Sequence, residues 1–181
     1  LYIDKRKLIK AEKYLLKSLE INKIENFQAD IANNLLNLGT IYENQGLLKK
    51  AEEYYLKSLE QYEIFYGKNN INLSSIQIQL ANLYTLNEEY EKAKKLLLKT
   101  LKIQKENLPA NHPSITTTLN NLAVHYAREK DFKKAEKIYL ERLDINEKTY
   151  GKLHPSVAKL KYNLGVSSLQ QKNYDEAESY L

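Results

Sequence analysis

The chain of 181 residues contains no cysteine, which excludes a disulfide framework and a thiolate metal site. The absence of cysteine agrees with a reducing compartment, so we expect a cytoplasmic protein. No apolar run approaches the roughly 18 residues that a membrane-spanning helix needs, and no signal-peptide pattern opens the chain. We therefore expect no membrane partner. Methionine is also absent, even at the first position, which indicates a segment of a longer protein.

What the sequence does contain is a repeat with a period of 42 residues. Alanine recurs at that interval at Ala51, Ala93, Ala135 and Ala177. The same register aligns three further sets: Leu38, Leu80, Leu122 and Leu164; Gly39, Ala81, Ala123 and Gly165; and Tyr42, Tyr84, Tyr126 and Ser168. A fixed period of this length indicates stacked supersecondary units.

Helical spacing of apolar residues divides each unit into two helices. The expected helices span residues 1–25, 28–45, 48–65, 73–87, 90–107, 113–130, 132–150, 155–171 and 174–181. Gly46 and Gly67 fall where helices end, and Pro113 and Pro155 fall where first helices begin. The recurring alanines mark the positions at which two helices cross closely.

We expect one repeat array over the whole chain, residues 1–181. Residues 1–25 form the second helix of an incomplete repeat, complete repeats follow at 28–66, 72–107 and 113–150, and an incomplete repeat occupies 155–181. Because the helix at 1–25 has no first helix of its own, part of its apolar face is expected to be uncovered.

The order Leu38-Gly39, Tyr42, Ala51, Tyr55 resembles the tetratricopeptide repeat. The segments HPSITTTLNNLAVHY, from His112, and YGKLHPSVAKLKYNLG, from Tyr150, are similar to the longer variant found in kinesin light chains. The middle copy departs from this pattern, since Asn70-Ile71 replaces the His-Pro pair. The resemblance implies an all-α, right-handed superhelix of antiparallel helix pairs. It also implies a non-catalytic scaffold that binds a partner protein or peptide on a concave groove lined by first helices.

One column of the expected groove consists of primary amides at the same register position: Asn37, Gln79, Asn121 and Asn163. An amide both donates and accepts hydrogen bonds, so such a column can bracket the backbone of an extended peptide. The peptide-binding asparagines of the family resemble this column. Neighbouring groove positions are Asn33, Thr40, Asn44, Ser75, Asn82, Thr117, Asn120, Val124, Arg128, Lys159 and Tyr162. Arg128 and Lys159 suit an acidic ligand, although both also fit solvated surface charges, and the asparagines also fit capping or bridging of adjacent helices.

Other function classes have weaker support in the sequence. No HExxH motif, Gly-rich phosphate loop or metal-ligand spacing is present, so no enzyme activity, cofactor or metal is expected within this segment. A net charge of +5 and a pI near 9.0 are compatible with RNA binding, but that function needs basic residues clustered on one face. Here lysines such as Lys49, Lys94 and Lys133 fall on second helices among acids, so we expect no nucleic-acid partner.

A structural role is the remaining alternative. The unpaired helices at 1–25 and 174–181 would allow self-association. The array would equally serve as a regulatory arm that packs against another domain, including an enzymatic one, of the same protein.

Overall fold

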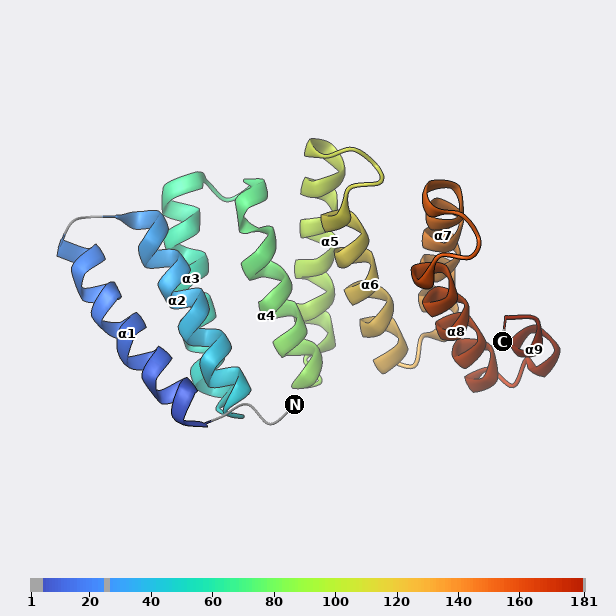
Figure 1. The fold of residues 1–181 in the computed structure, drawn as a ribbon, viewed down its shortest axis with the longest axis horizontal. Coiled ribbons are helices and arrows are strands. Elements are labelled where there is room, and N and C mark those ends of the chain that lie inside the picture. Colours follow the sequence, from blue (N-terminus) through green and yellow to red (C-terminus); the bar gives the residue numbers. More distant parts are fainter. Residues whose placement is uncertain (1–4, 25–26, 181) are drawn as a thin grey trace. The chain divides into compact units, whose positions relative to one another are not determined.

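The computed structural model describes residues 5–24 and 27–180, and the elements in this part of the chain are helices (Figure 1). They are α1 (Lys5–Ile24), α2 (Gln28–Asn44), α3 (Leu48–Tyr66), the 3-10 turn η1 (Ile71–Leu73), α4 (Ser74–Leu86), α5 (Tyr90–Asn107), α6 (Pro113–Arg128), α7 (Phe132–Tyr150), α8 (Pro155–Gln170) and α9 (Tyr174–Tyr180). The all-α prediction is confirmed. Residues 1–4 and 25 of the first expected helix, and residue 181 of the last, lie outside the described residues.

The helix ends agree closely with the sequence pattern, with two informative differences. The first helix of the middle repeat opens with the 3-10 turn η1 before α4 begins at Ser74. The helix expected over 113–130 ends earlier, at Arg128, because Lys130 takes a left-handed backbone conformation with φ of 63°. Both differences arise at turns, where hydrogen bonding of single residues sets the boundary.

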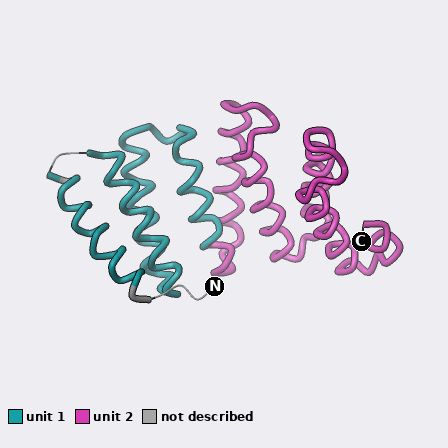
Figure 2. Tube along the Cα trace, in the orientation of Figure 1, with its two compact units in different colours: residues 1–83 teal, residues 84–181 magenta. Residues whose placement is uncertain are grey.

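The chain forms two compact units, residues 1–83 and 84–181, and the boundary between them falls within α4 (Figure 2). In unit 1, α2 packs against both α1 and α3. In unit 2, each helix from α5 to α9 packs against the next one along the chain. Consecutive helices joined by short turns are therefore packing neighbours within each unit.

Small residues lie where the helices of a pair pack. In unit 1, Ala51 and Tyr55 of α3 are fully buried, and the Tyr55 ring lies directly against the backbone of Gly39 on α2. Beyond this contact, the Tyr55 hydroxyl donates a hydrogen bond of 2.6 Å to the Glu43 carboxylate on the same helix as Gly39. In unit 2, Ala123 and Ala135 are fully buried at the corresponding register positions. Close helix packing at small residues thus occurs in each unit.

The first helices of the last three repeats begin with a side-chain cap, whereas α2 has none at Phe27. Nδ1 of His112 accepts a hydrogen bond of 3.1 Å from the backbone N–H of Ser114, and His154 accepts one of 3.2 Å from Ser156. In the middle repeat, Oδ1 of Asn70 accepts a bond of 2.9 Å from the N–H two residues later. The pair Asn70-Ile71 therefore performs the capping role of His-Pro, since an amide oxygen and a ring nitrogen both accept from the free N–H groups of a first helical turn.

The turn from first to second helix has the same backbone conformation in all four repeats. The residue at this position has a positive φ: 76° at Gly46, 61° at Glu88, 63° at Lys130 and 63° at Lys172. Glycine adopts this region without cost, whereas a residue with a Cβ is disfavoured there. The first repeat therefore carries the residue that suits the turn best.

Among the described helices, none is both long enough and apolar enough to cross a bilayer.

Replacing Lys130 by glycine should stabilise the chain. The substitution removes the steric cost of a left-handed lysine, and we expect the free energy of unfolding to rise by about 0.5–1 kcal/mol in urea denaturation. Lys137→Gly, at an exposed position inside α7, is the matched control and should lower it by about 1 kcal/mol. A loss of stability in both variants would contradict the assigned turn.

Replacing Gly39 by alanine should destabilise unit 1. A Cβ at this position would overlap the Tyr55 ring, so we expect a loss of about 1–3 kcal/mol in urea denaturation. The next repeat carries Ala81 and Leu97 at the corresponding positions. The double variant Gly39→Ala, Tyr55→Leu should therefore lose less than the sum of the two single losses. Strict additivity would show that the two residues do not constrain each other.

Candidate functional site

The four groove residues predicted on α2 lie on one stripe of that helix. Asn33, Asn37 and Asn44 are exposed, and Thr40 is half-buried. Two of them already have partners in the fold. Oδ1 of Asn33 accepts a hydrogen bond of 2.5 Å from the Tyr62 hydroxyl, and the Thr40 hydroxyl donates to a carbonyl of its own helix at 3.2 Å. Asn37 and Asn44 make no side-chain hydrogen bond within the described part of the chain, so their amides are available.

In unit 1, α4 contributes the remaining predicted residues. Ser75 is exposed, and Gln79 and Asn82 are half-buried. No side-chain hydrogen bond to another described residue engages these three. The amide of Gln79 is therefore as available as that of Asn37.

In unit 2, the predicted residues lie on α6 and α8 and all are exposed or half-buried. They are Thr117, Asn120, Asn121, Val124 and Arg128 on α6, and Lys159, Tyr162 and Asn163 on α8. Asn121 and Asn163, one repeat apart, are both half-buried and form no side-chain hydrogen bond with another described residue. A half-buried amide without a partner retains its hydrogen-bonding capacity for a ligand.

The structure brings four of these residues together in a cleft of about 210 Å³ in unit 2, which we call the Arg142 cleft. Residues of α6, α7 and α8 line it: Thr116, Thr117, Asn120, Arg142, Ser156, Lys159, Leu160 and Asn163. Nη1 of Arg142 donates a hydrogen bond of 2.9 Å to Oδ1 of Asn120. Asn120, one of the predicted groove amides, therefore accepts a hydrogen bond from a buried arginine.

Arg142 is the site residue that the sequence analysis missed. It lies on α7, a second helix, whereas the resemblance implied a groove lined by first helices. A signal was nevertheless present, because the same register position holds Ser58 and Thr100 in the two preceding repeats. An arginine in place of a small hydroxyl residue is a break in the repeat, and the long side chain spans the helix pair to reach α6.

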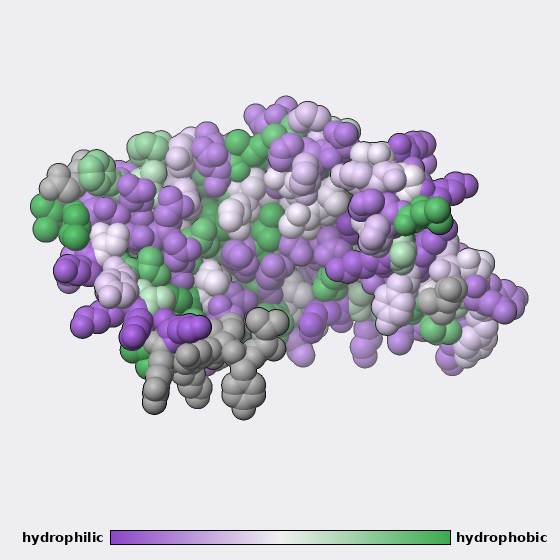
Figure 3. Space-filling view, in the orientation of Figure 1, coloured by the Kyte–Doolittle hydropathy of each residue, from purple (hydrophilic) through white to green (hydrophobic). Residues whose placement is uncertain are grey.

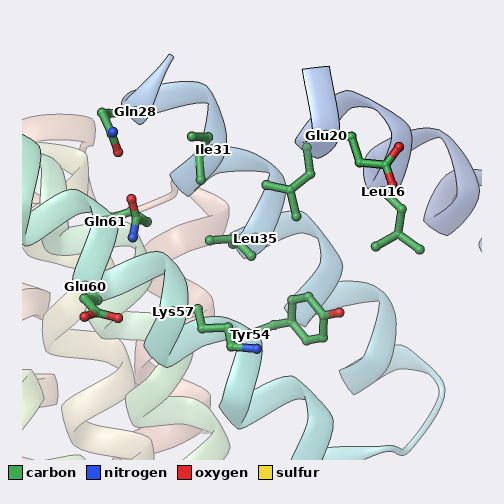
Figure 4. A pocket seen from close by; sticks show the side chains of 10 residues that line it. Leu16, Glu20, Gln28, Ile31, Leu35, Tyr54, Lys57, Glu60 and Gln61 are labelled. Atoms are coloured by element: carbon green, nitrogen blue, oxygen red, sulfur yellow. The ribbon is translucent and has the colours of Figure 1, made fainter. Parts of the chain in front are cut away.

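A second cleft, of about 650 Å³, lies in unit 1 between α1, α2 and α3 (Figure 4). Its walls include the aliphatic side chains of Leu16, Ile31 and Leu35, with Glu60 and Gln61 among its polar residues. Because Ile31 and Leu35 occupy a different face of α2 from Asn33 and Asn37, this cleft is separate from the predicted groove. The sequence did not predict a site here. It did predict that part of the apolar face of the first helix is uncovered.

Some of the lysines on the second helices form ion pairs with nearby acids. Lysines contact acids one turn away, as in Lys57 with Glu53 at 2.6 Å and Lys148 with Asp144 at 2.8 Å. Figure 3 shows hydrophilic and hydrophobic residues interspersed over the face it presents. Exposed pairs of this kind contribute little to stability. They do place negatively charged side chains among the lysines on this surface.

His125 on α6 is a buried histidine with polar neighbours. Its Nδ1 lies 3.3 Å from the Thr85 hydroxyl, and its Nε2 lies 3.7 Å from a carboxylate oxygen of Glu129. A hydroxyl and a carboxylate are therefore adjacent to this histidine. The ring has 0% exposure, however, so no substrate atom can reach it in this conformation.

Burial determines the protonation of His125. It lowers the pKa of the imidazole below its usual value, and the nearby Lys94 acts in the same direction, whereas the carboxylates of Glu129 and Glu91 oppose it. The two preceding repeats carry Ile41 and Leu83 at this register position. His125 therefore occupies a core position that is aliphatic in the two preceding repeats and is Ser167 in the following one.

Within the described residues, no group of three or more histidine, aspartate or glutamate side chains is arranged to hold a metal ion.

Comparison with known proteins extends these observations. The sequence model of a family described as "Tetratricopeptide repeat" matches residues 30–106 and 114–181. No curated protein matches the chain.

Several solved structures share the fold over nearly the whole chain. BtubC (BKLC) from P. vanneervenii is similar with a TM-score of 0.78 and 24% identity, covering 97% of this chain and 70% of that one. A putative kinesin light chain with nearly identical TPR-like repeats from Podosopora anserina gives a TM-score of 0.83 at 20% identity, with 97% and 84% covered. MamA gives 0.65 at 17% identity, with 99% and 92% covered.

His125 should make the stability of the chain decrease at mildly acidic pH. Because its pKa is lowered in the folded state, the unfolded chain binds a proton on this ring below about pH 6.5 while the folded chain does not. We expect His125→Leu to remove about 1 kcal/mol of the stability difference between pH 7.5 and pH 5.5, measured by urea denaturation. An unchanged pH dependence in this variant would show that the folded and unfolded chains bind a proton on this ring equally well.

Proposed function

Because the chain belongs to the tetratricopeptide repeat family, with repeats of the kinesin light chain type, we propose that it is a non-catalytic scaffold that binds a partner protein through an extended peptide segment. In unit 2, the faces of α6 and α8 that carry Asn121 and Asn163 form the binding surface. No reaction chemistry is assigned to this surface, and its affinity comes from hydrogen bonds and from contacts with apolar side chains.

The observation that supports this proposal most directly is the pair Asn121 and Asn163. They occupy equivalent positions on α6 and α8 of unit 2, are half-buried, and have no side-chain hydrogen bond with another described residue. Each amide is accessible to solvent and can exchange its bonds to water for bonds to a ligand. A ligand that supplies the missing partners gives these side chains a function.

Peptide backbone is the ligand group that fits such amides best. Each amide offers one acceptor oxygen and two donor hydrogens, so it can pair with both a peptide N–H and a peptide C=O. Exposed side chains next to the amides, Val124 and Tyr162, provide apolar surface for ligand side chains. Backbone pairing would supply affinity for many sequences, and the neighbouring side chains would select among them.

Self-association is a second candidate because of the exposure of α1. Tyr14, Ile21 and Ile24 of this helix are exposed at 72%, 50% and 81%. Apolar side chains grouped on one helix are a feature of protein interfaces. Sedimentation at increasing protein concentration distinguishes this role, because it predicts a dimer that Ile21→Lys and Ile24→Lys together convert to a monomer.

The peptide-binding proposal is tested with a phage-displayed library of random peptides selected on the 181-residue chain. The affinity of enriched peptides is then measured by calorimetry. We expect Asn121→Ala with Asn163→Ala to weaken binding by about tenfold or more, because two hydrogen bonds worth roughly 0.5–1.5 kcal/mol each are lost. N-methylation of the bound peptide at single backbone positions should weaken binding as well, since it removes N–H donors.

The matched control replaces two exposed asparagines that lie outside the first helices, Asn69→Ala with Asn107→Ala, and should leave the affinity unchanged. Circular dichroism confirms that each variant is folded. The proposal fails if the library yields no enriched peptide, or if both double variants bind the enriched peptides as tightly as the original chain.

A further inference from the structure

Arg142 occupies a position that small hydroxyl residues fill in the two preceding repeats. The Ser58 hydroxyl donates a hydrogen bond of 2.7 Å to the carbonyl of Ala32, and the Thr100 hydroxyl donates one of 2.9 Å to the carbonyl of Leu96. Such bonds need only a short, neutral side chain. A cation at this position is therefore not required by the packing of a repeat.

The charge of Arg142 is buried without a counter-charge. The residue is 9% exposed, its Nε is buried without a hydrogen-bond partner, and its only side-chain hydrogen bond to a described residue is to the neutral amide of Asn120. No carboxylate among the described residues forms an ion pair with it. Buried charges are normally paired, and an arginine does not relieve its burial by losing a proton at neutral pH.

The space beside Arg142 is suited to an anion. The guanidinium borders the Arg142 cleft and a neighbouring cleft of about 290 Å³, and both are also lined by Thr116, Thr117 and Ser156. No aspartate or glutamate is among the described residues that line either cleft. Lys159 lies at the Arg142 cleft, is exposed, and forms no ion pair with a described acid. The hydroxyls of Thr117 and Ser156 already have partners, the carbonyl of Pro113 at 3.0 Å and Nδ1 of His154 at 2.8 Å. The cleft therefore offers an anion two cations that have no acid partner among the described residues, together with the Thr116 hydroxyl.

We propose that the Arg142 cleft binds the carboxylate of an aspartate or glutamate side chain in an acidic peptide segment. The inference rests on the proposed peptide-binding function and names the ligand chemistry of the same site. Asn163, a member of the amide column, forms part of the cleft wall. A peptide whose backbone is held by this amide thus places an adjacent side chain beside Arg142.

The size of the cleft suits the carboxylate of one side chain better than a large anion. A volume of about 210 Å³ is below that of a typical pocket for a drug-sized ligand and suits a single side chain. The planar guanidinium complements a carboxylate, and the exposed Lys159 adds a second positive charge at the edge of the cleft.

The test uses a probe that does not depend on peptide-groove binding. The 181-residue chain is titrated at low ionic strength with N-acetyl-glutamate N-methylamide, and NMR monitors the Arg142 Nε–H signal and the backbone amides of Thr117 and Ser156. We expect saturable shifts with a millimolar dissociation constant. The neutral N-acetyl-glutamine N-methylamide has the same shape and should bind at least tenfold more weakly.

Arg142→Thr is the matched variant, because threonine is the native residue at the corresponding position 100. It should remain folded by circular dichroism and lose the shifts of Thr117 and Ser156. Lys159→Ala should weaken binding several-fold without abolishing it, since Lys159 is exposed. If Arg142→Thr does not fold, Arg142→Lys replaces it, which keeps the charge but loses the planar fork and should weaken binding.

Three results would overturn the proposal: equal shifts with the glutamate and glutamine probes, absence of shifts with both, or unchanged glutamate binding in the variant that lacks Arg142. Tighter binding of inorganic phosphate than of the glutamate probe would also overturn it and would assign the cleft to phosphate. Because the probes are single capped amino acids, these outcomes are independent of the library selection. Peptides can therefore bind the amide column even if the Arg142 cleft binds no carboxylate.

Discussion

Close approach of the two helices in each pair is the constraint on which the rest of this structure depends. Ala51 and Ala135 are fully buried at the crossing positions, and in unit 1 the approach is close enough that the Tyr55 ring fills the space where a Cβ of Gly39 would lie. Replacing a small residue on a close-packed interface by a larger one would force the helices apart. The orientation of the first helices, and with it the face that carries the amides, therefore follows from residues that contact no ligand.

Hydrogen bonding divides the predicted amides into two groups. Asn33 accepts from Tyr62, and Asn120 accepts from Arg142, so these two link a first helix to the second helix of its pair. Asn37, Asn121 and Asn163 have no such partner among the described residues. The two interpretations of the asparagines therefore need not exclude each other. Some join helices within the fold, and others remain available to a ligand on the same surface.

Much of the fold was predictable because its signals are local and recur every 42 residues. The positions of Pro113 and Pro155 at helix starts, and of Gly46 at a turn, follow from backbone chemistry alone. The cap at Asn70 was harder to recognise, because the replacement of His-Pro reads as a departure from the pattern. Its side chain nevertheless accepts the same N–H as the histidines do, so chemically different residues satisfy one backbone requirement.

The sequence by itself determined that the chain consists of helix pairs, where each pair begins and ends, and which faces are apolar, since these depend on periodicity and on residues adjacent along the chain. Only the tertiary structure decided which polar side chains meet. Arg142 reaches Asn120 across 22 residues of sequence, and His125 meets Thr85 across 40. Such contacts depend on side-chain length and on the spacing of packed helices, neither of which is recorded in the repeat pattern.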